Sequence, residues 1–152
     1  MSGKSYSDEL ERALARPDAA QMCRDLDAYA EHHERGGDWP EEYAEAFSEI
    51  ISCYHDDPEK AFAYVILGAS RSDDAAFLGL LGCGPLEDVL DDPSEELLER
   101  VIAEARKSDR FRWLLSHPFK AAVAPRVWDA IEKFRITGPH EEPPADRLPP
   151  RR

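Results

Sequence analysis

The sequence has few basic residues for its acidic content, and it has no long apolar run. Among its 152 residues, 32 are acidic and 19 are basic, which gives a formal net charge of -13. Binding to a nucleic-acid backbone depends on Lys and Arg, so this balance argues against a phosphate-backbone binder. No apolar stretch approaches the ~20 residues that a membrane span needs. We therefore expect neither a nucleic-acid partner nor a membrane partner.

The cysteines and the N-terminus indicate a cytoplasmic protein. Cys23, Cys53 and Cys83 form no Cys-x-x-Cys pair and are odd in number. A disulfide framework or a structural zinc site would need paired thiols at closer spacing. The N-terminal residues lack the apolar core and the cleavage-site pattern of a secretory signal. We therefore expect reduced thiols and a cytoplasmic location.

The spacing of apolar residues is helical throughout, without the sustained period-two alternation of a strand. Prolines and glycines divide the chain into short amphipathic segments. The sequence therefore predicts an all-α fold, an irregular stack of seven to nine short antiparallel helices. Asp-Asp-Pro occurs at 56–58 and again at 91–93, each time before an amphipathic segment. This weak repeat favours HEAT- or TPR-like helix pairs.

One helical domain is expected over residues 1–137, followed by a tail over 138–152. The helix that follows Pro58 is apolar on nearly every side and should be the most buried element. The predicted core comprises Phe62, Val65, Ile66, Leu67, Leu80, Leu81, Leu98, Val101 and Ile102. The tail holds five of the 12 prolines and little apolar surface. Such a composition predicts disorder.

The charge is concentrated in one part of the chain. Residues 37–99 contain 17 acidic and 2 basic side chains, whereas residues 100–137 contain 9 basic and 4 acidic ones. We expect the basic segment to neutralise part of the acidic one within the fold. The densest group of acids flanks two predicted helix starts, and its members are the candidate partner-binding residues: Glu87, Asp88, Asp91, Asp92, Glu95 and Glu96.

A surface of one charge sign accelerates association with a partner of the opposite sign. The leading interpretation is a non-enzymatic, cytosolic protein–protein interaction module whose acidic face meets a basic protein surface. An immunity or antitoxin-like inhibitor of a basic protein is one concrete form. Two alternatives stay open. One is a small enzyme that uses Glu87, Asp88 or Cys83, and the other is an accessory domain whose acidity serves solubility only.

The remaining motifs favour structural roles. His32-His33-Glu34 and His55-Asp56-Asp57 resemble loose groups of metal ligands, but neither has the i, i+4 histidine pair of a helical metal site. We therefore expect no metal, no cofactor and no catalytic residue. The segment Gly82-Cys83-Gly84-Pro85 is predicted to be a tight turn between helices, with Gly82 at positive φ. The three tryptophans are predicted to pack in the core.

The segment Gly-Cys-Gly-Pro-Leu-Glu-Asp-Val-Leu, at 82–90, resembles a family of small bacterial domains of unknown function built around Gly-Pro-Leu-Glu-Asp-Leu-Leu. Those domains carry a hydrophobic helix before this core, then an Ala-Arg-rich helix, a Phe-Arg-x-x-Leu stretch and a late Trp. The counterparts here are residues 76–81, 104–107, 111–115 and Trp128. The resemblance covers residues 38–135 and departs from the pattern at Cys83 and Val89. It implies an all-helical bacterial domain and supplies no activity or catalytic residue.

Overall fold

The computed structural model describes residues 8–34 and 40–151, and within them it contains helices and no strand. The predicted all-α fold is confirmed. The α-helices are α1 (Asp8–Leu14), α2 (Ala19–His32), α3 (Glu41–Ser52), α4 (Pro58–Arg71), α5 (Ala75–Leu81), α6 (Glu87–Asp91), α7 (Glu95–Lys107), α8 (Asp109–Leu115) and α9 (Pro125–Ile131). Across these ranges no helix combines the length and the apolar character needed to cross a membrane.

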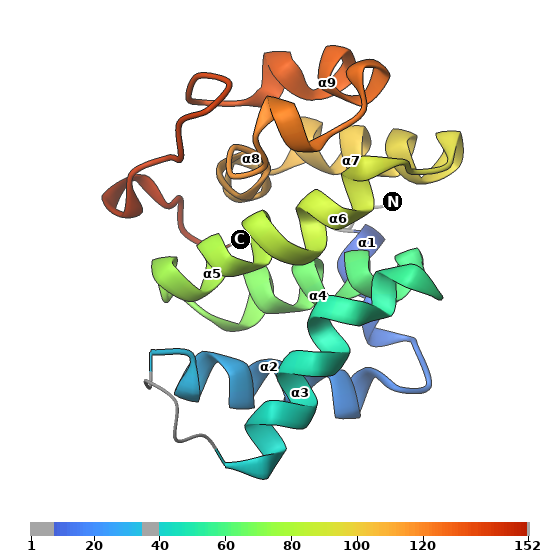
Figure 1. Ribbon diagram of the computed structural model, residues 1–152, viewed down its shortest axis with the longest axis vertical. Helices are drawn as coiled ribbons and strands as arrows, with labels where there is room; N and C mark the ends of the chain where they lie inside the picture. Colours follow the sequence, from blue (N-terminus) through green and yellow to red (C-terminus); the bar gives the residue numbers. More distant parts are fainter. Residues whose placement is uncertain (1–7, 35–39, 152) are drawn as a thin grey trace.

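Helix α4 occupies the centre of the molecule. Its N-terminus is capped by Asp57, whose side chain accepts a hydrogen bond from the Lys60 N–H at 3.1 Å, and Pro58 fills the first helical position. All residues from 61 to 68 are buried. The helix packs against α1, α2, α3, α5 and α6. Figure 1 shows α2 and α3 at one end of the long axis and α7 to α9 at the other, with α4 between them.

The predicted core is confirmed, with one correction. Phe62, Val65, Ile66, Leu67, Leu81 and Val101 are buried, and Leu98 and Ile102 are partly buried and pack against the core. Leu80 is 39% exposed. Helix α5 buries one face, formed by Phe77, Leu78 and Leu81, and Leu80 lies off that face. The run Ala-Ala-Phe-Leu-Gly-Leu-Leu is apolar throughout, so its periodicity could not show which leucine faces solvent.

Helix α5 does not end at Gly82, because a π-helical turn over Gly82–Leu86 continues it into α6. The prediction of a positive φ at Gly82 is wrong, since φ is -69°. Glycine is needed there for a different reason. A Cβ atom on Gly82 would lie 2.7 Å from the Cβ of His117 and 2.9 Å from the carbonyl oxygen of Leu114. The missing side chain therefore allows the end of α8 to pack directly on the turn.

The two Asp-Asp-Pro segments are used differently. Asp57 caps α4, but Ser94 caps α7 by accepting a hydrogen bond from the Leu97 N–H at 3.1 Å. Asp92 instead forms an ion pair with Arg126 at 2.9 Å. The sequence repeat therefore marks two helix starts, but their caps are not equivalent.

The C-terminal tail, for which the sequence predicts disorder, contacts the domain at several of its described residues. The indole N–H of the buried Trp113 donates to the Pro144 carbonyl at 3.0 Å, and Arg110 donates to the Pro149 carbonyl at 2.6 Å. Pro143 is buried, and Leu148 packs against the core. Most of these anchors are backbone carbonyls, which a count of apolar side chains does not register. Proline also loses little conformational freedom on ordering.

Two of the three tryptophans confirm the prediction that they pack in the core. Trp113 is 1% exposed and Trp128 is 3% exposed. The guanidinium of Arg135 lies 5.0 Å from the centre of the Trp128 ring, a separation suited to a cation–π contact. Trp39 lies outside the described residues.

Candidate functional site

The six candidate acids lie along α6 and the start of α7, but they do not form one uniform surface. Glu87 and Asp88 are half-buried, while Asp91 and Asp92 at the end of α6 are exposed. Glu95 and Glu96 occupy the exposed first turn of α7. The group therefore divides into a half-buried inner pair and an exposed outer set. The outer set lies where α6 leads into α7, two helices that Figure 1 labels.

Glu87 has a structural partner. Its carboxylate accepts a hydrogen bond from the backbone N–H of Phe119 at 3.2 Å, which joins α6 to the segment after α8. Burial raises the pKa of Glu87, the Phe119 N–H opposes this effect, and the nearby Asp88 adds to it. Because α5 runs on into α6, Glu87 does not stand at a free helix N-terminus. Glu87 was placed at a predicted helix start, but the structure places it in a contact between segments that are distant in the sequence.

Asp88 faces a different neighbour from Glu87. Burial raises the pKa of Asp88, the electrostatic interaction with His55 opposes the rise, and the charge of Asp91 adds to it. His55 belongs to the short 3-10 turn Cys53–His55 after α3. The inner pair is thus divided between the α3 side and the α8 side of the helix.

Three carboxylates of the outer set, those of Asp91, Glu95 and Glu96, are exposed to solvent and accessible to a partner. Asp92 is paired with Arg126, which also donates to the Pro93 carbonyl at 2.7 Å. In the part of the chain that the structure describes, Asp91, Glu95 and Glu96 take part in no ion pair. We call these three residues the α6–α7 acidic corner.

Several cations of the basic segment, by contrast, are bound within the fold. Arg100 pairs with Glu9 at 2.7 Å and with Glu59 at 2.6 Å, and only 14% of its side chain is exposed. Hydrogen bonding to Glu9 raises the pKa of Arg100, burial opposes this, and Glu59 adds to the rise. This residue joins α7 to α1 and α4, so its charge is compensated internally.

Arg110 is hydrogen-bonded to more residues of the chain than Arg100 is. Its guanidinium donates to the carbonyls of Ala69, Ser72 and Pro149 and pairs with Asp73 at 2.9 Å. Its side chain is 7% exposed. One buried cation therefore holds together the end of α4, the segment before α5 and the C-terminal tail. The sequence predicts that the basic segment neutralises acidic residues. It does not predict that Arg110 binds backbone carbonyls, because every residue has a carbonyl and its position in the fold cannot be inferred from residue type.

Cys83 lies in an environment that keeps its thiol protonated. Its Sγ donates to the Glu142 carboxylate at 3.4 Å. Burial raises the pKa of Cys83 to about 12, and the negative charges of Glu142 and Glu87 act in the same direction. Because the thiolate is the nucleophilic form, this environment disfavours a reactive cysteine.

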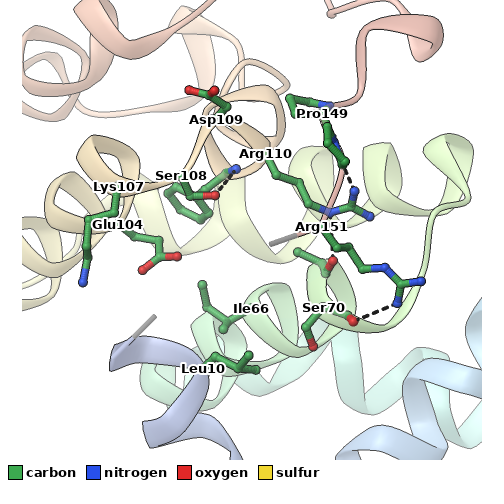
Figure 2. Close-up of a pocket in the computed structure, with 13 residues that line it drawn as sticks. Leu10, Ile66, Ser70, Glu104, Lys107, Ser108, Asp109, Arg110, Pro149 and Arg151 are labelled. Carbon is green, nitrogen blue, oxygen red and sulfur yellow. Dashed lines mark hydrogen bonds between the residues drawn. The ribbon is translucent and has the colours of Figure 1, made fainter. Parts of the chain in front are cut away.

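A cavity among the described residues lies away from these side chains. It has a volume of about 540 Å³ and lies between α1, α4, the α7–α8 junction and the end of the tail. Figure 2 shows Leu10 and Ile66 on one side of it and Arg110, Pro149 and Arg151 on the other. Small-ligand pockets span roughly 300–1,000 Å³, so its size is suitable for one. Glu87, Asp88 and Cys83 do not line it.

The polar groups around the cavity already have structural partners. The Ser70 hydroxyl donates to the Leu67 carbonyl, and the Ser108 hydroxyl accepts the Phe111 N–H at the start of α8. Arg110 donates four hydrogen bonds to the carbonyls and the carboxylate described above. Arg151 donates to the Ser70 carbonyl (Figure 2) and also to the Asp73 carboxylate. These contacts hold the tail in place and supply no arrangement of nucleophile and base.

The two histidine groups of the sequence also take separate positions. His32 is buried against Tyr43, with ring centres 6.0 Å apart, so it is not a surface histidine. His33 lies beside Asp74 at the start of α5. The His55 ring lies against Tyr54, with ring centres 4.0 Å apart and ring planes tilted by 33°. Asp74, which comes from a distant helix start, was not among the residues singled out in the sequence.

Comparison with known proteins identifies a family. A family of unknown function (DUF6869) matches residues 32–138, a range that contains the whole stretch carrying the sequence resemblance. Neither a curated protein nor a solved structure matches the chain. Because the match extends over most of the chain and over α3 to α9, the protein belongs to the family of unknown function DUF6869.

Proposed function

We propose that the protein is a non-enzymatic interaction module that binds a basic protein surface through the α6–α7 acidic corner. The observation that carries the proposal is the contrast in partners. Asp91, Glu95 and Glu96 are exposed, and no ion pair holds them within the described residues. Arg100 and Arg110 are enclosed by acids and carbonyls of the same chain. Internal pairing therefore leaves this corner with uncompensated negative charge.

The electrostatics define the kind of partner. A cluster of exposed carboxylates repels phosphate and carboxylate groups and attracts Lys- and Arg-rich surfaces. Charges at the edge of an interface act mainly on the rate of association and on its salt dependence. A partner that must be captured quickly, such as a basic nuclease or toxin, gains most from such steering. An immunity or antitoxin-like role in the bacterial cytoplasm is the concrete form of this proposal.

The enzymatic alternative has less support. Burial and two neighbouring carboxylates raise the pKa of Cys83. The Glu87 carboxylate already accepts a hydrogen bond from the Phe119 N–H. The alternative that acidity serves only solubility predicts that any acidic residue of the surface can be exchanged without a specific effect. The experiment below separates this alternative from a binding surface.

The test is capture from a bacterial lysate with a matched pair of charge reversals. Asp91→Lys with Glu95→Lys changes the acidic corner. Glu41→Lys with Glu45→Lys changes the net charge equally on α3, which lies toward the other end of the molecule (Figure 1). Each pair alters two exposed acids, one of them in the first turn of a helix.

We expect the unmodified protein to capture basic proteins at low salt and to lose them at high salt. The corner variant should lose the same proteins, and the α3 variant should retain them. Equal loss in both variants would assign the effect to net charge alone and would favour the solubility alternative. Capture that is insensitive to salt and to both reversals would contradict the proposal.

A further inference from the structure

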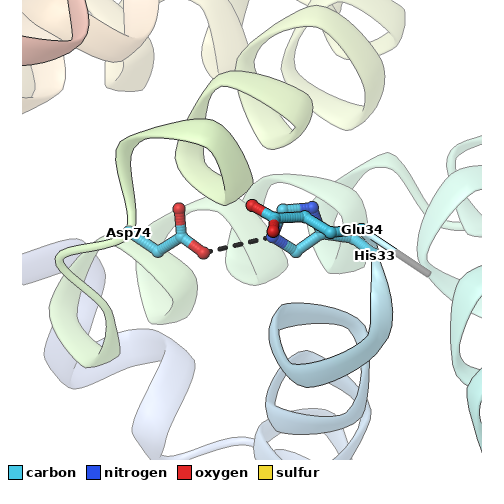
Figure 3. Close-up of side chains that lie close together, drawn as sticks. All are labelled: His33, Glu34 and Asp74. Carbon is cyan, nitrogen blue, oxygen red and sulfur yellow. Dashed lines mark hydrogen bonds and ion pairs between the residues drawn. The ribbon is translucent and has the colours of Figure 1, made fainter.

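The end of α2 and the start of α5 bring together three side chains that can bind a metal ion. His33 and Glu34 follow α2, and Asp74 precedes α5. Each offers one ligand atom, and these atoms all lie within 4.8 Å of one another. The Nε2 atom of His33 is 3.1 Å from Oδ2 of Asp74. Figure 3 shows the three side chains meeting between the two helix ends.

His33 is held in place by the core. Its side chain is only 5% exposed. The ring lies 6.1 Å from Phe77 of α5 and 6.4 Å from Tyr29 of α2, measured between ring centres. The imidazole therefore has little freedom to turn away from Asp74. Ligands that are fixed before the metal arrives lose less conformational freedom when it binds.

Asp74 is fixed by the cap of α5. Its Oδ1 atom accepts hydrogen bonds from the backbone N–H groups of Ala76 at 3.0 Å and Phe77 at 3.3 Å. Its Oδ2 atom is the one that faces His33. Both oxygens of the Asp74 carboxylate are therefore held by fixed neighbours, with Oδ2 directed at the proposed ligand His33.

The donor set selects a class of metal. One imidazole nitrogen and two carboxylate oxygens suit Zn²⁺, whereas Ca²⁺ and Mg²⁺ take oxygen ligands. Bonds of about 2.0–2.2 Å place the ligands of a tetrahedral zinc ion roughly 3.3–3.6 Å apart. The His33–Asp74 pair is already close to this separation, and the exposed Glu34 can approach by rotating its side chain. Two carboxylates also balance the charge of a divalent cation.

We propose that His33, Glu34 and Asp74 form a Zn²⁺ site that clamps the C-terminal end of α2 to the N-terminal start of α5, with water completing the coordination. The ion replaces the hydrogen bond between His33 Nε2 and Asp74 Oδ2, and the proton of that bond passes to solvent. The site is independent of the acidic corner, so each proposal can fail without the other.

The test measures zinc binding by the untagged, metal-free full chain, using competition with a chromogenic zinc chelator and thermal unfolding. We expect one Zn²⁺ per chain and a higher melting temperature when zinc is present. His33→Ala, Glu34→Gln and Asp74→Asn should each weaken zinc binding by at least about ten-fold, since even the loss of a group that only supports a ligand has an effect of that size. His55→Ala, which removes an exposed histidine beside two acids, should bind zinc as the unmodified protein does.

The variants separate ligand loss from misfolding. Asn is as good an N-cap as Asp, so Asp74→Asn keeps the cap of α5 while removing the charge of the ligand. Glu34 is exposed, so Glu34→Gln leaves the packing of the chain unchanged. Zinc affinity that is unchanged in Glu34→Gln and Asp74→Asn would overturn the proposal. The proposal also fails if His55→Ala weakens binding as much as His33→Ala, or if the unmodified chain binds no zinc.

Discussion

Arg110 and the α6–α7 acidic corner put charged residues to opposite uses. Arg110 is 7% exposed and contacts three carbonyls and one carboxylate from three segments of the chain. Asp91, Glu95 and Glu96 are exposed, and within the described residues none forms an ion pair. The net charge of -13 hides this difference. Burial and partners, more than residue type, determine which charges hold the fold and which are available to another molecule.

The two regions also differ in the energetic effect that a substitution should have. Removing one member of a buried polar network leaves the others without partners, and that loss is large. Substituting an exposed charge usually changes stability by less than about 0.5 kcal/mol. The comparison can therefore be tested by substitutions ordered from the buried network to the surface.

Arg110→Ala should have the largest effect on stability. The carbonyls of Ala69, Ser72 and Pro149 lose their shared donor, and the tail loses an anchor. We expect a loss of roughly 2–4 kcal/mol in the free energy of unfolding, measured with urea. Arg106→Ala, at an exposed position of α7, is the control and should be nearly neutral. Equal effects of the two variants would contradict the role assigned to Arg110.

Truncation after Thr137 should lower the melting temperature by on the order of 5 °C. The deletion removes the Pro144 carbonyl from Trp113, the Pro149 carbonyl from Arg110 and the Arg151 pair with Asp73. The effects of truncation and Arg110→Ala should be less than additive, because both act on one network. An unchanged melting temperature in the truncated chain would mean that the tail adds nothing to stability.

Gly82→Ala should destabilise the fold by about 1–3 kcal/mol, because the new methyl group meets His117 and the Leu114 carbonyl at 2.7–2.9 Å. Gly84→Ala is the matched control two residues along, where a Cβ atom meets nothing within 4 Å. Urea unfolding of both variants gives the comparison. If Gly82→Ala left the free energy of unfolding unchanged, the close packing of α8 on the π-helical turn would be refuted.

Glu87→Gln should change how stability depends on pH. Burial raises the pKa of Glu87 in the folded state, so between its ordinary value of 4.5 and the raised one the folded chain binds more protons than the unfolded chain. Stability from this group therefore falls as pH rises through that window, and the deficit persists at neutral pH. Gln cannot ionise but can still accept the Phe119 N–H.

We therefore expect Glu87→Gln to be modestly more stable than the unmodified chain at pH 7, and the advantage to vanish below the ordinary pKa. Unfolding by urea at the two pH values measures both effects. A variant that is less stable at pH 7 would show that the ionised carboxylate itself is required for the bond to Phe119.

The sequence predicts the fold class and the centre of the fold because those depend on local patterns. Apolar residues on every side of 61–68 indicate burial, and α4 is buried there. The end of α5 was predicted wrongly because a glycine before a proline usually breaks a helix, whereas here tertiary packing carries the helix through a π turn. Propensity is local, and the contact between Gly82 and His117 spans 35 residues.

The candidate site was predicted only in part. The six acids were found from charge density, and their division into an inner pair and an exposed corner depends on contacts with Phe119 and Arg126 that sequence spacing does not reveal. His33 and Glu34 were recognised as metal-ligand types, but their partner Asp74 lies about forty residues away on another helix. Backbone carbonyls that bind Arg110 have no sequence signature at all.

The central claim is that the acidic corner binds a basic partner, and the most direct measurement is the rate of association with a captured basic protein at low and high ionic strength. For Asp91→Lys with Glu95→Lys, we predict slower association, a weaker salt dependence and an unfolding free energy within about 0.5 kcal/mol of the unmodified chain. Glu41→Lys with Glu45→Lys should keep the rate and salt dependence of the unmodified protein. Identical rates and salt slopes in the two double variants would contradict the claim.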